Sequence, residues 1–201
     1  MPKIKISPIS VLWITFLIAS ETSYLLPTVI AVALHELGHI IAARILKIRI
    51  SSLEITILGA RMETVGEISY KKEFLFALGG PLFGALTFAV CYPLRSLPNV
   101  FLPLSDFFLF LSLISLALAL FNLIPLPSLD GSRLIKCLLK HLLPLDTAER
   151  IMRIIGFFSL FTLWLFSAYL VIKTSGGLEM LIFCAIFFAK SFIFDNEKRD
   201  F

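Results

Sequence analysis

The chain has 201 residues, of which 58% are hydrophobic and only 16% are charged, and its mean hydropathy is +0.94. Soluble domains are typically about 45–50% apolar and about 25% charged, so the composition excludes a soluble globular protein, and it is the opposite of a disordered one. The net charge of +4 does not indicate nucleic-acid binding, because the basic residues form no patch interleaved with aromatic residues. Three widely spaced cysteines indicate neither a disulfide framework nor a thiolate zinc site.

Apolar runs in chain order predict an all-α polytopic membrane protein with about six transmembrane helices. A spanning helix needs about 20 predominantly apolar residues, and the chain has room for six such runs with short connections. We expect residues 1–201 to form a single membrane-embedded domain with no soluble regulatory domain. The runs cover residues 8–20, 24–46, 74–94, 101–124, 151–172 and 178–194.

The basic residues are sorted between the two sides that six spans define. The N-terminal residues, the 44–73 and 125–153 connections and the C-terminal tail share one side and hold 16 of the 18 Lys and Arg residues. The other side holds Arg95 and Lys173. Cytoplasmic connections of membrane proteins carry an excess of Lys and Arg, so we expect both termini to be cytoplasmic.

The connection after the second span has a pattern of its own. Residues 51–69 alternate apolar and polar side chains around Gly59-Ala60, which predicts a small β-hairpin lying at the membrane surface. In the third span, Gly80 and Gly84 stand four residues apart. Small residues at this spacing let helices approach closely, so helix packing is favoured over a direct functional role for both glycines.

The second predicted span contains the candidate metal-binding and catalytic residues. His35, Glu36 and His39 form an H-E-x-x-H motif in an otherwise apolar helix. Two histidines four residues apart lie on one helix face and can bind one metal ion, while the glutamate beside them can take a proton from water. Charged groups in a span are costly and rare unless they serve a function. Zinc suits these ligands best, although iron or cobalt also fits.

A catalytic zinc ion usually has three protein ligands and one open position, so a third ligand is needed. His141 falls in a basic amphipathic stretch that is more typical of an interfacial helix than of a metal site. Asp130 follows the fourth span, where Pro125 and Pro127 break the helix and Gly131 permits a tight turn. Non-helical backbone at membrane depth is tolerated only inside the protein or at a wet cavity. We therefore favour Asp130 as the third ligand.

These motifs occur in a fixed order: KIKISP, HELGH, ILGARME, KEFLFALGGPLFGA and FNLIPLPSLDG. The set resembles the site-2 protease family (M50) of intramembrane zinc metalloproteases, and most of all the stage IV sporulation protein FB group, over nearly the whole chain. The resemblance implies that His35, His39 and Asp130 bind one Zn²⁺ ion and that Glu36 is the general base. It also implies that Asn122 helps to hold the substrate, although a helix-end residue is the alternative interpretation.

The resemblance further implies regulated intramembrane proteolysis of a membrane-associated sporulation sigma-factor precursor, at the forespore-surrounding membrane, under the control of small membrane inhibitor proteins. The CBS domain that such relatives often carry is not expected here. Two alternatives stay open. A metal-binding membrane transporter would need a series of polar stations along its path. A catalytically silent relative would only bind other membrane proteins, and the intact motif argues against it.

Overall fold

The computed structural model describes residues 3–6, 24–56, 59–66, 68–96, 102–126 and 129–174. The chain divides into two compact units, Met1–Leu123 and Ile124–Phe201. The predicted spans at 8–20 and 178–194 lie outside the described residues, so four of the six predicted spans can be compared with the structure.

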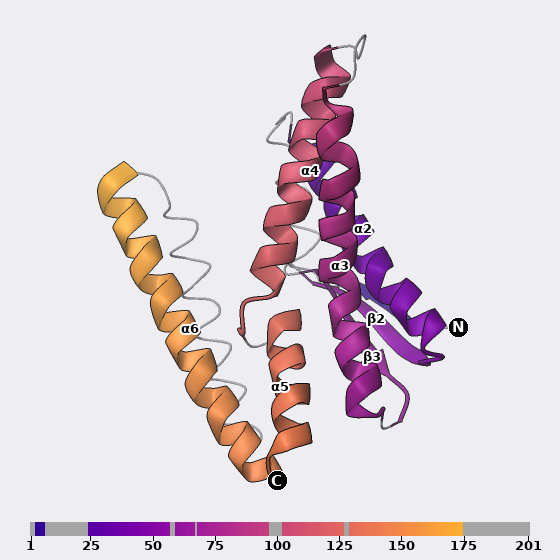
Figure 1. Ribbon diagram of the computed structural model, residues 1–201, viewed down its shortest axis with the longest axis vertical. Coiled ribbons are helices and arrows are strands. Elements are labelled where there is room, and N and C mark those ends of the chain that lie inside the picture. Colours follow the sequence, from indigo (N-terminus) through magenta and orange to yellow (C-terminus); the bar gives the residue numbers. More distant parts are fainter. Residues whose placement is uncertain are drawn as a thin grey trace. The chain divides into compact units, whose positions relative to one another are not determined.

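Three long helices form the body of the first unit: α2 (Leu25–Ile45), α3 (Tyr70–Leu94) and α4 (Leu102–Asn122), and each packs against the other two (Figure 1). They correspond to the predicted spans at 24–46, 74–94 and 101–124, and each is long and apolar enough to cross a membrane. α3 begins at Tyr70 rather than at 74, because the lysines and glutamate that precede its apolar run are good helix formers and extend the helix.

The helices of this unit approach closely at glycines. A Cβ atom on Gly79 would lie 2.7 Å from the carbonyl oxygen of Gly38, so α2 and α3 cross with their backbones in contact. A Cβ atom on Gly84 would lie 2.9 Å from the carbonyl oxygen of Ser115 and 3.0 Å from the Cβ of Ala119, so α3 and α4 meet there. The packing role predicted for Gly84 is confirmed.

A three-stranded sheet accompanies these helices. Its order is β1 (Lys3–Ile6), β2 (Ile50–Thr56) and β3 (Gly59–Thr64). β1 runs parallel to β2, and β2 runs antiparallel to β3. The hairpin is predicted at 51–69; β2 begins one residue earlier, β2 and β3 pair antiparallel, and residues 57–58 between them lie outside the described part of the chain. The sequence pattern does not predict β1. A position at the membrane surface stays a prediction. Met62 and Ile48 pack with Phe76 and Ala43 in a buried cluster that joins this connection to the helices.

The second unit contains α5 (Asp130–Leu142) and α6 (Leu145–Thr174). Residues Leu145–Lys173 of α6 form a candidate span that includes the predicted 151–172 run. The expected turn at Gly131 is wrong: Asp130 is the first residue of a helix, and Gly131 is buried within it. The chain instead leaves the helical conformation after Asn122, where α4 ends, and Pro125, which has no N–H to donate, lies in the stretch that follows.

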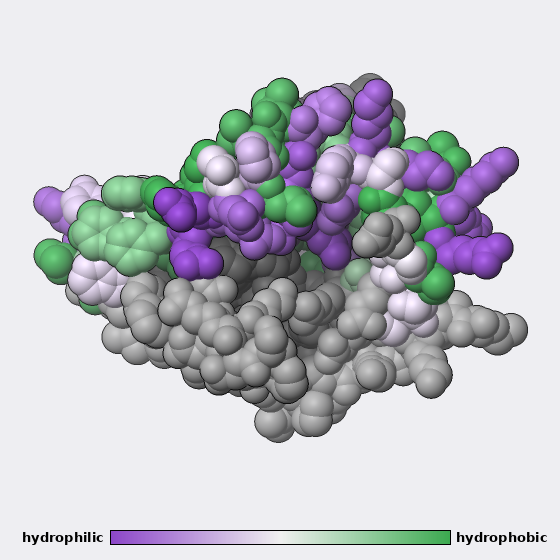
Figure 2. Space-filling model, turned by 90° about the horizontal axis from the view of Figure 1, so that it is seen from below, coloured by the Kyte–Doolittle hydropathy of each residue, from purple (hydrophilic) through white to green (hydrophobic). Residues whose placement is uncertain are grey.

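The surface divides into polar and apolar parts. Figure 2 views the end at which α3 begins, and hydrophilic side chains gather on this face. Along the helices, by contrast, large apolar side chains are exposed, among them Leu82, Leu86 and Val90 on α3 and Phe158, Trp164 and Ile172 on α6. Exposed apolar surface along whole helices is typical of contact with lipid.

Candidate metal centre

His35 and His39 lie one turn apart on the same face of α2 and are almost fully buried, with exposed fractions of 3% and 6%. Their ring centroids are 5.1 Å apart, and the ring planes are inclined by 77°. The four-residue spacing of the motif therefore produces the paired imidazoles that the sequence predicts.

A hydrogen bond to α3 fixes the orientation of His39. Its Nδ1 atom lies 2.9 Å from the carbonyl oxygen of Phe76, in a buried environment. Because a carbonyl oxygen only accepts, Nδ1 carries the proton in this bond, and Nε2 keeps a lone pair. Metal-binding histidines typically donate their other ring N–H in this way, which sets the tautomer and orients the ring. His39 is thus prepared to bind a metal through Nε2.

Gly80 keeps open the space in front of the two imidazoles. A Cβ atom at this position would lie 2.6 Å from Nε2 of His35 and closer still to Nε2 of His39. Zinc–nitrogen bonds are about 2.0–2.1 Å long, so a side chain here would occupy the space that an ion needs. The sequence favoured packing for Gly80, but the glycine instead faces the histidines, because the crossing of α2 and α3 at Gly38 and Gly79 directs it there.

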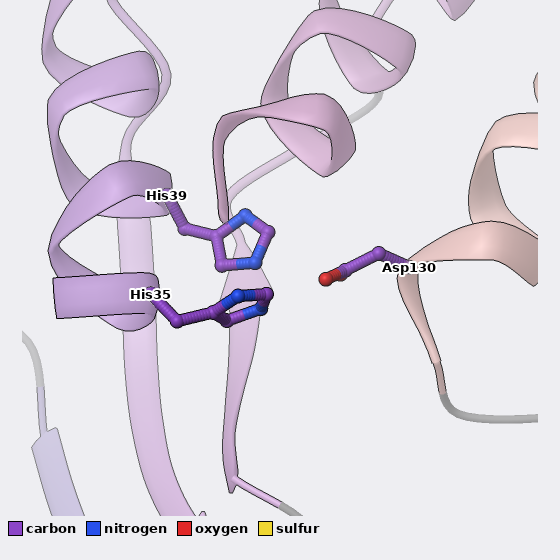
Figure 3. Close-up of side chains that lie close together, drawn as sticks. All are labelled: His35, His39 and Asp130. Carbon is purple, nitrogen blue, oxygen red and sulfur yellow. The ribbon is translucent and has the colours of Figure 1, made fainter. Parts of the chain in front are cut away.

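Asp130 completes a group of three ligand atoms. One ligand atom from each of His35, His39 and Asp130 lies within 4.8 Å of the other two, and Figure 3 shows the three side chains together. Asp130 begins α5, where the helix dipole favours a negative charge. Two imidazoles and one carboxylate form a donor set that catalytic zinc sites use. The donor chemistry and the space at Gly80 therefore fit a zinc ion.

The other residues singled out in the sequence lie at three places. Glu36 follows His35 on α2 and is partly buried. Asn122 is the last residue of α4 and is 8% exposed, and its Nδ2 donates to the carbonyl oxygen of Leu118 at 3.0 Å. This bond engages the Nδ2 donor of Asn122 and stabilises the helix end. His141 lies in the last turn of α5 and does not belong to the group of ligand atoms.

The histidine pair lies deep along its helix. His35 stands midway between Leu25 and Ile45, which places it roughly 15 Å from either end of α2 at 1.5 Å per residue. Gly80 is equally far from the start of α3 at Tyr70. If α2 and α3 cross the bilayer, the imidazoles lie well inside it.

Comparisons with known proteins agree with this geometry. Residues 97–163 match the model of peptidase family M50. This segment includes Asn122 and Asp130 and covers a third of the chain. No curated protein sequence matches the chain.

Most of the chain is similar in fold to a solved structure, the site-2 protease from Methanocaldococcus jannaschii. The two share 21% sequence identity, with a TM-score of 0.65 over 92% of this chain and 86% of that chain. At this identity the likeness shows the fold. Together, the peptidase segment and the fold support a metalloendopeptidase with several membrane-spanning helices.

Proposed function

We propose that this protein is an intramembrane zinc metalloprotease that hydrolyses a peptide bond of a membrane-associated protein. The observation that carries the proposal is the group of His35, His39 and Asp130, with Gly80 leaving space in front of the two Nε2 atoms. The histidines lie at the middle of an apolar helix long enough to span a membrane, where costly polar groups require a function.

Each residue of the motif has a role in this chemistry. His35, His39 and Asp130 hold the ion, which supplies a Lewis acid that polarises the scissile carbonyl and makes water easier to deprotonate. Glu36 takes the proton from the attacking water and then delivers a proton to the leaving amine. The hydrogen bond from His39 to the Phe76 carbonyl holds the imidazole in place throughout.

A substrate helix must unwind before it is cut, because its peptide bonds are otherwise engaged in helical hydrogen bonds. Among the described strands, β3 pairs only with β2, so its other edge is available to hold an extended peptide by strand addition. Asn122 carries an Oδ1 acceptor for a substrate N–H in addition to the Nδ2 donor that bonds to the Leu118 carbonyl. Both features would keep the scissile segment extended near the ion.

The order of the motifs supports a narrower form of the proposal. A member of the stage IV sporulation protein FB group would cleave a sporulation sigma-factor precursor and answer to small membrane inhibitor proteins. The distribution of Lys and Arg supports a cell-membrane location with both termini cytoplasmic, and the sporulation role adds the forespore-surrounding membrane.

The transporter alternative finds less support. A transport path needs successive polar stations across the membrane. The described residues contain a single group of His, Cys, Asp or Glu suited to a metal, and the other buried polar residues of α3 and α4 are Thr87, Ser112, Ser115 and Asn122. A catalytically silent binding protein would not need Glu36 beside the ligands.

The decisive experiment compares Glu36→Gln with the unmodified protein, co-expressed with a candidate membrane-tethered precursor. The variant should retain stoichiometric zinc and lose cleavage. Glu73→Gln is the matched control, because Glu73 lies in the first turn of α3, away from the motif, and it should cleave normally. Cleavage that persists in Glu36→Gln would overturn the role of Glu36, and a protein that never binds zinc would overturn the proposal.

A further inference from the structure

The turn after α2 holds a lysine in a conformation that usually belongs to glycine. Within the described part of the chain, Lys47 is the one non-glycine residue with a positive φ angle, at 55°. Its N–H donates to the carbonyl oxygen of Arg44 at 3.2 Å, and the N–H of Ile48 donates to that of Ala43 at 2.8 Å. These bonds form a Schellman motif, whose left-handed position is usually taken by Gly or Asn. A lysine is less stable here than glycine, so its side chain calls for a functional explanation.

Two further basic residues lie at the same end of the first unit. Ile48 stands between Lys47 and Arg49, and it packs in the buried cluster that also contains Phe76 of α3. Lys72 precedes Phe76 by four residues, so it lies one turn earlier on the same face of α3. We call Lys47, Arg49 and Lys72 the basic cluster.

The basic cluster carries a net positive charge at an exposed surface. All three of its side chains are exposed, and none of them forms an ion pair with another described residue. The stretches 44–50 and 68–73 contain five basic residues and a single acidic one, Glu73. Figure 2 shows hydrophilic side chains gathered on this face of the molecule. The surface therefore complements a negatively charged ligand.

The basic cluster lies within reach of a peptide that occupies the metal centre. Lys72 precedes Gly80 by eight residues of α3, which is about 12 Å at 1.5 Å per residue. An extended peptide covers this distance in about four residues, at about 3.3 Å per residue. β3 also ends beside the cluster, because the N–H of Val65 donates to the carbonyl oxygen of Arg49 at 2.9 Å. A substrate cut in front of Gly80 thus presents a residue about four positions from the cut bond to the cluster.

We propose that the basic cluster binds an acidic residue of the substrate, about four positions from the scissile bond, on the side that leaves the membrane where α3 begins. The inference rests on the proposed function and names the substrate class: a membrane-associated protein with Asp or Glu beside its apolar segment. Lys72 shares a face of α3 with Phe76, whose carbonyl orients His39, whereas Lys71 lies about 100° away around the helix. Anionic headgroups surround a helix end and would meet both lysines alike, so this arrangement favours a peptide.

Binding is measured on the full chain carrying Glu36→Gln, in the neutral detergent dodecyl maltoside, so that neither cleavage nor lipid charge affects the result. The probes are two fluorescent peptides, each with an apolar span of Leu and Ala followed by a polar flank that holds either two Asp or two Asn residues. Fluorescence anisotropy gives the ratio of the two affinities. We expect the Asp peptide to bind more tightly, and Lys47→Gly, Arg49→Gln and Lys72→Gln each to lower the ratio about two- to fivefold, as for the loss of one exposed ion pair.

Lys71→Gln is the matched control, because it removes the same charge from the same end of α3 on another face, and it should leave the ratio unchanged. Lys47→Gly separates binding from folding. Glycine suits a φ of 55°, so this variant should lose part of the preference while its thermal unfolding midpoint rises. Equal affinities for the two peptides, equal effects of Lys71→Gln and Lys72→Gln, or binding of neither peptide would overturn the inference.

Cleavage by the chain with Glu36 intact distinguishes this inference from the proposed function. In phosphatidylcholine discs, kcat/KM should be higher for the Asp peptide, and Lys72→Gln should lower this preference to the same extent as in binding. A protein that prefers the Asp peptide in binding but cleaves neither peptide would contradict the proposed function and leave the cluster as an acidic-peptide site. Cleavage of both peptides with equal kcat/KM would support the proposed function and overturn the inference.

Discussion

The Nδ1 atom of His39 lies 2.9 Å from the carbonyl oxygen of Phe76, so the ring that faces the metal space on α2 is held by the backbone of α3. No side-chain substitution can delete this acceptor directly. The orientation of the ring depends instead on how closely the two helices approach, and this is set by the contact of Gly38 with Gly79.

Gly79→Ala should therefore weaken metal binding without touching a ligand. The added Cβ would meet Gly38 and Ala42 at 2.7–2.8 Å, so α2 and α3 must separate, and the bond from His39 to Phe76 must lengthen. Loss of such an orienting bond typically costs 10- to 100-fold in metal affinity. Competition with a chelator gives the zinc affinity, and an unchanged value would show that the helix crossing does not control the site.

Gly80→Ala should have a larger effect, because its Cβ would fill the space in front of both Nε2 atoms. We expect the purified variant to contain no zinc by elemental analysis and to have no proteolytic activity. Gly84→Ala is the matched control, since that Cβ would meet Ser115 and Ala119 on α4, and it should lower stability while keeping the ion. A zinc-replete Gly80→Ala protein would contradict the assignment of this space to the metal.

Asp130→Asn should change the coordination of a bound ion. In the Co²⁺-substituted protein, loss of an anionic oxygen ligand alters the visible spectrum and lowers the affinity, while the stability changes by only about 0.3–1 kcal/mol through the helix dipole. His141→Gln is the control on the same helix and should leave the spectrum as it is. Identical spectra for Asp130→Asn and the unmodified protein would remove Asp130 from the ligand set.

Asn122→Ala separates a substrate role from a helix-end role. Loss of the Oδ1 acceptor should raise KM with little change in kcat if Asn122 only positions the substrate. Loss of the bond to the Leu118 carbonyl would instead lower the thermal stability by about 0.5–1.5 kcal/mol and leave KM unchanged. Steady-state kinetics with a purified precursor, measured beside thermal unfolding, distinguish the two roles.

Membrane topology is tested by the accessibility of small tags from outside intact cells. Tags at the N-terminus and between β2 and β3 should lie on one side, and a tag between α3 and α4 on the other. The excess of Lys and Arg places the first two inside. A tag before β1 that is accessible from the side opposite to the β2–β3 tag would contradict both the strand pairing and the six-span arrangement.

Periodicity and composition were sufficient to predict the four described spans and the histidine pair, because hydrophobic length and four-residue spacing are local properties of the chain. Other features depend on which helix faces which. Gly80 and Gly84 carry the same sequence signal, and yet Gly84 meets α4 while Gly80 meets the imidazoles. The backbone carbonyl of Phe76 that orients His39 could not be predicted from the sequence, because every residue type has such a carbonyl.

The ends of helices were also predicted less well than their cores. Asp130 was expected on an unwound turn, but the residues after it, although partly basic, favour a helix, and the turn at Gly131 does not form. β1 was missed because its four residues are too short for alternation to stand out, and its partner β2 lies beyond a complete helix.

The parallel pairing of β1 with β2 constrains the number of times that the chain crosses the bilayer between these two strands. Two strands of one sheet lie on one side of a bilayer, so the number of crossings between Ile6 and Ile50 must be even. The hydrogen-bonded pairing of β1 with β2 thus indicates that these two strands lie on the same side of the membrane. This evidence is independent of where the lysines and arginines lie.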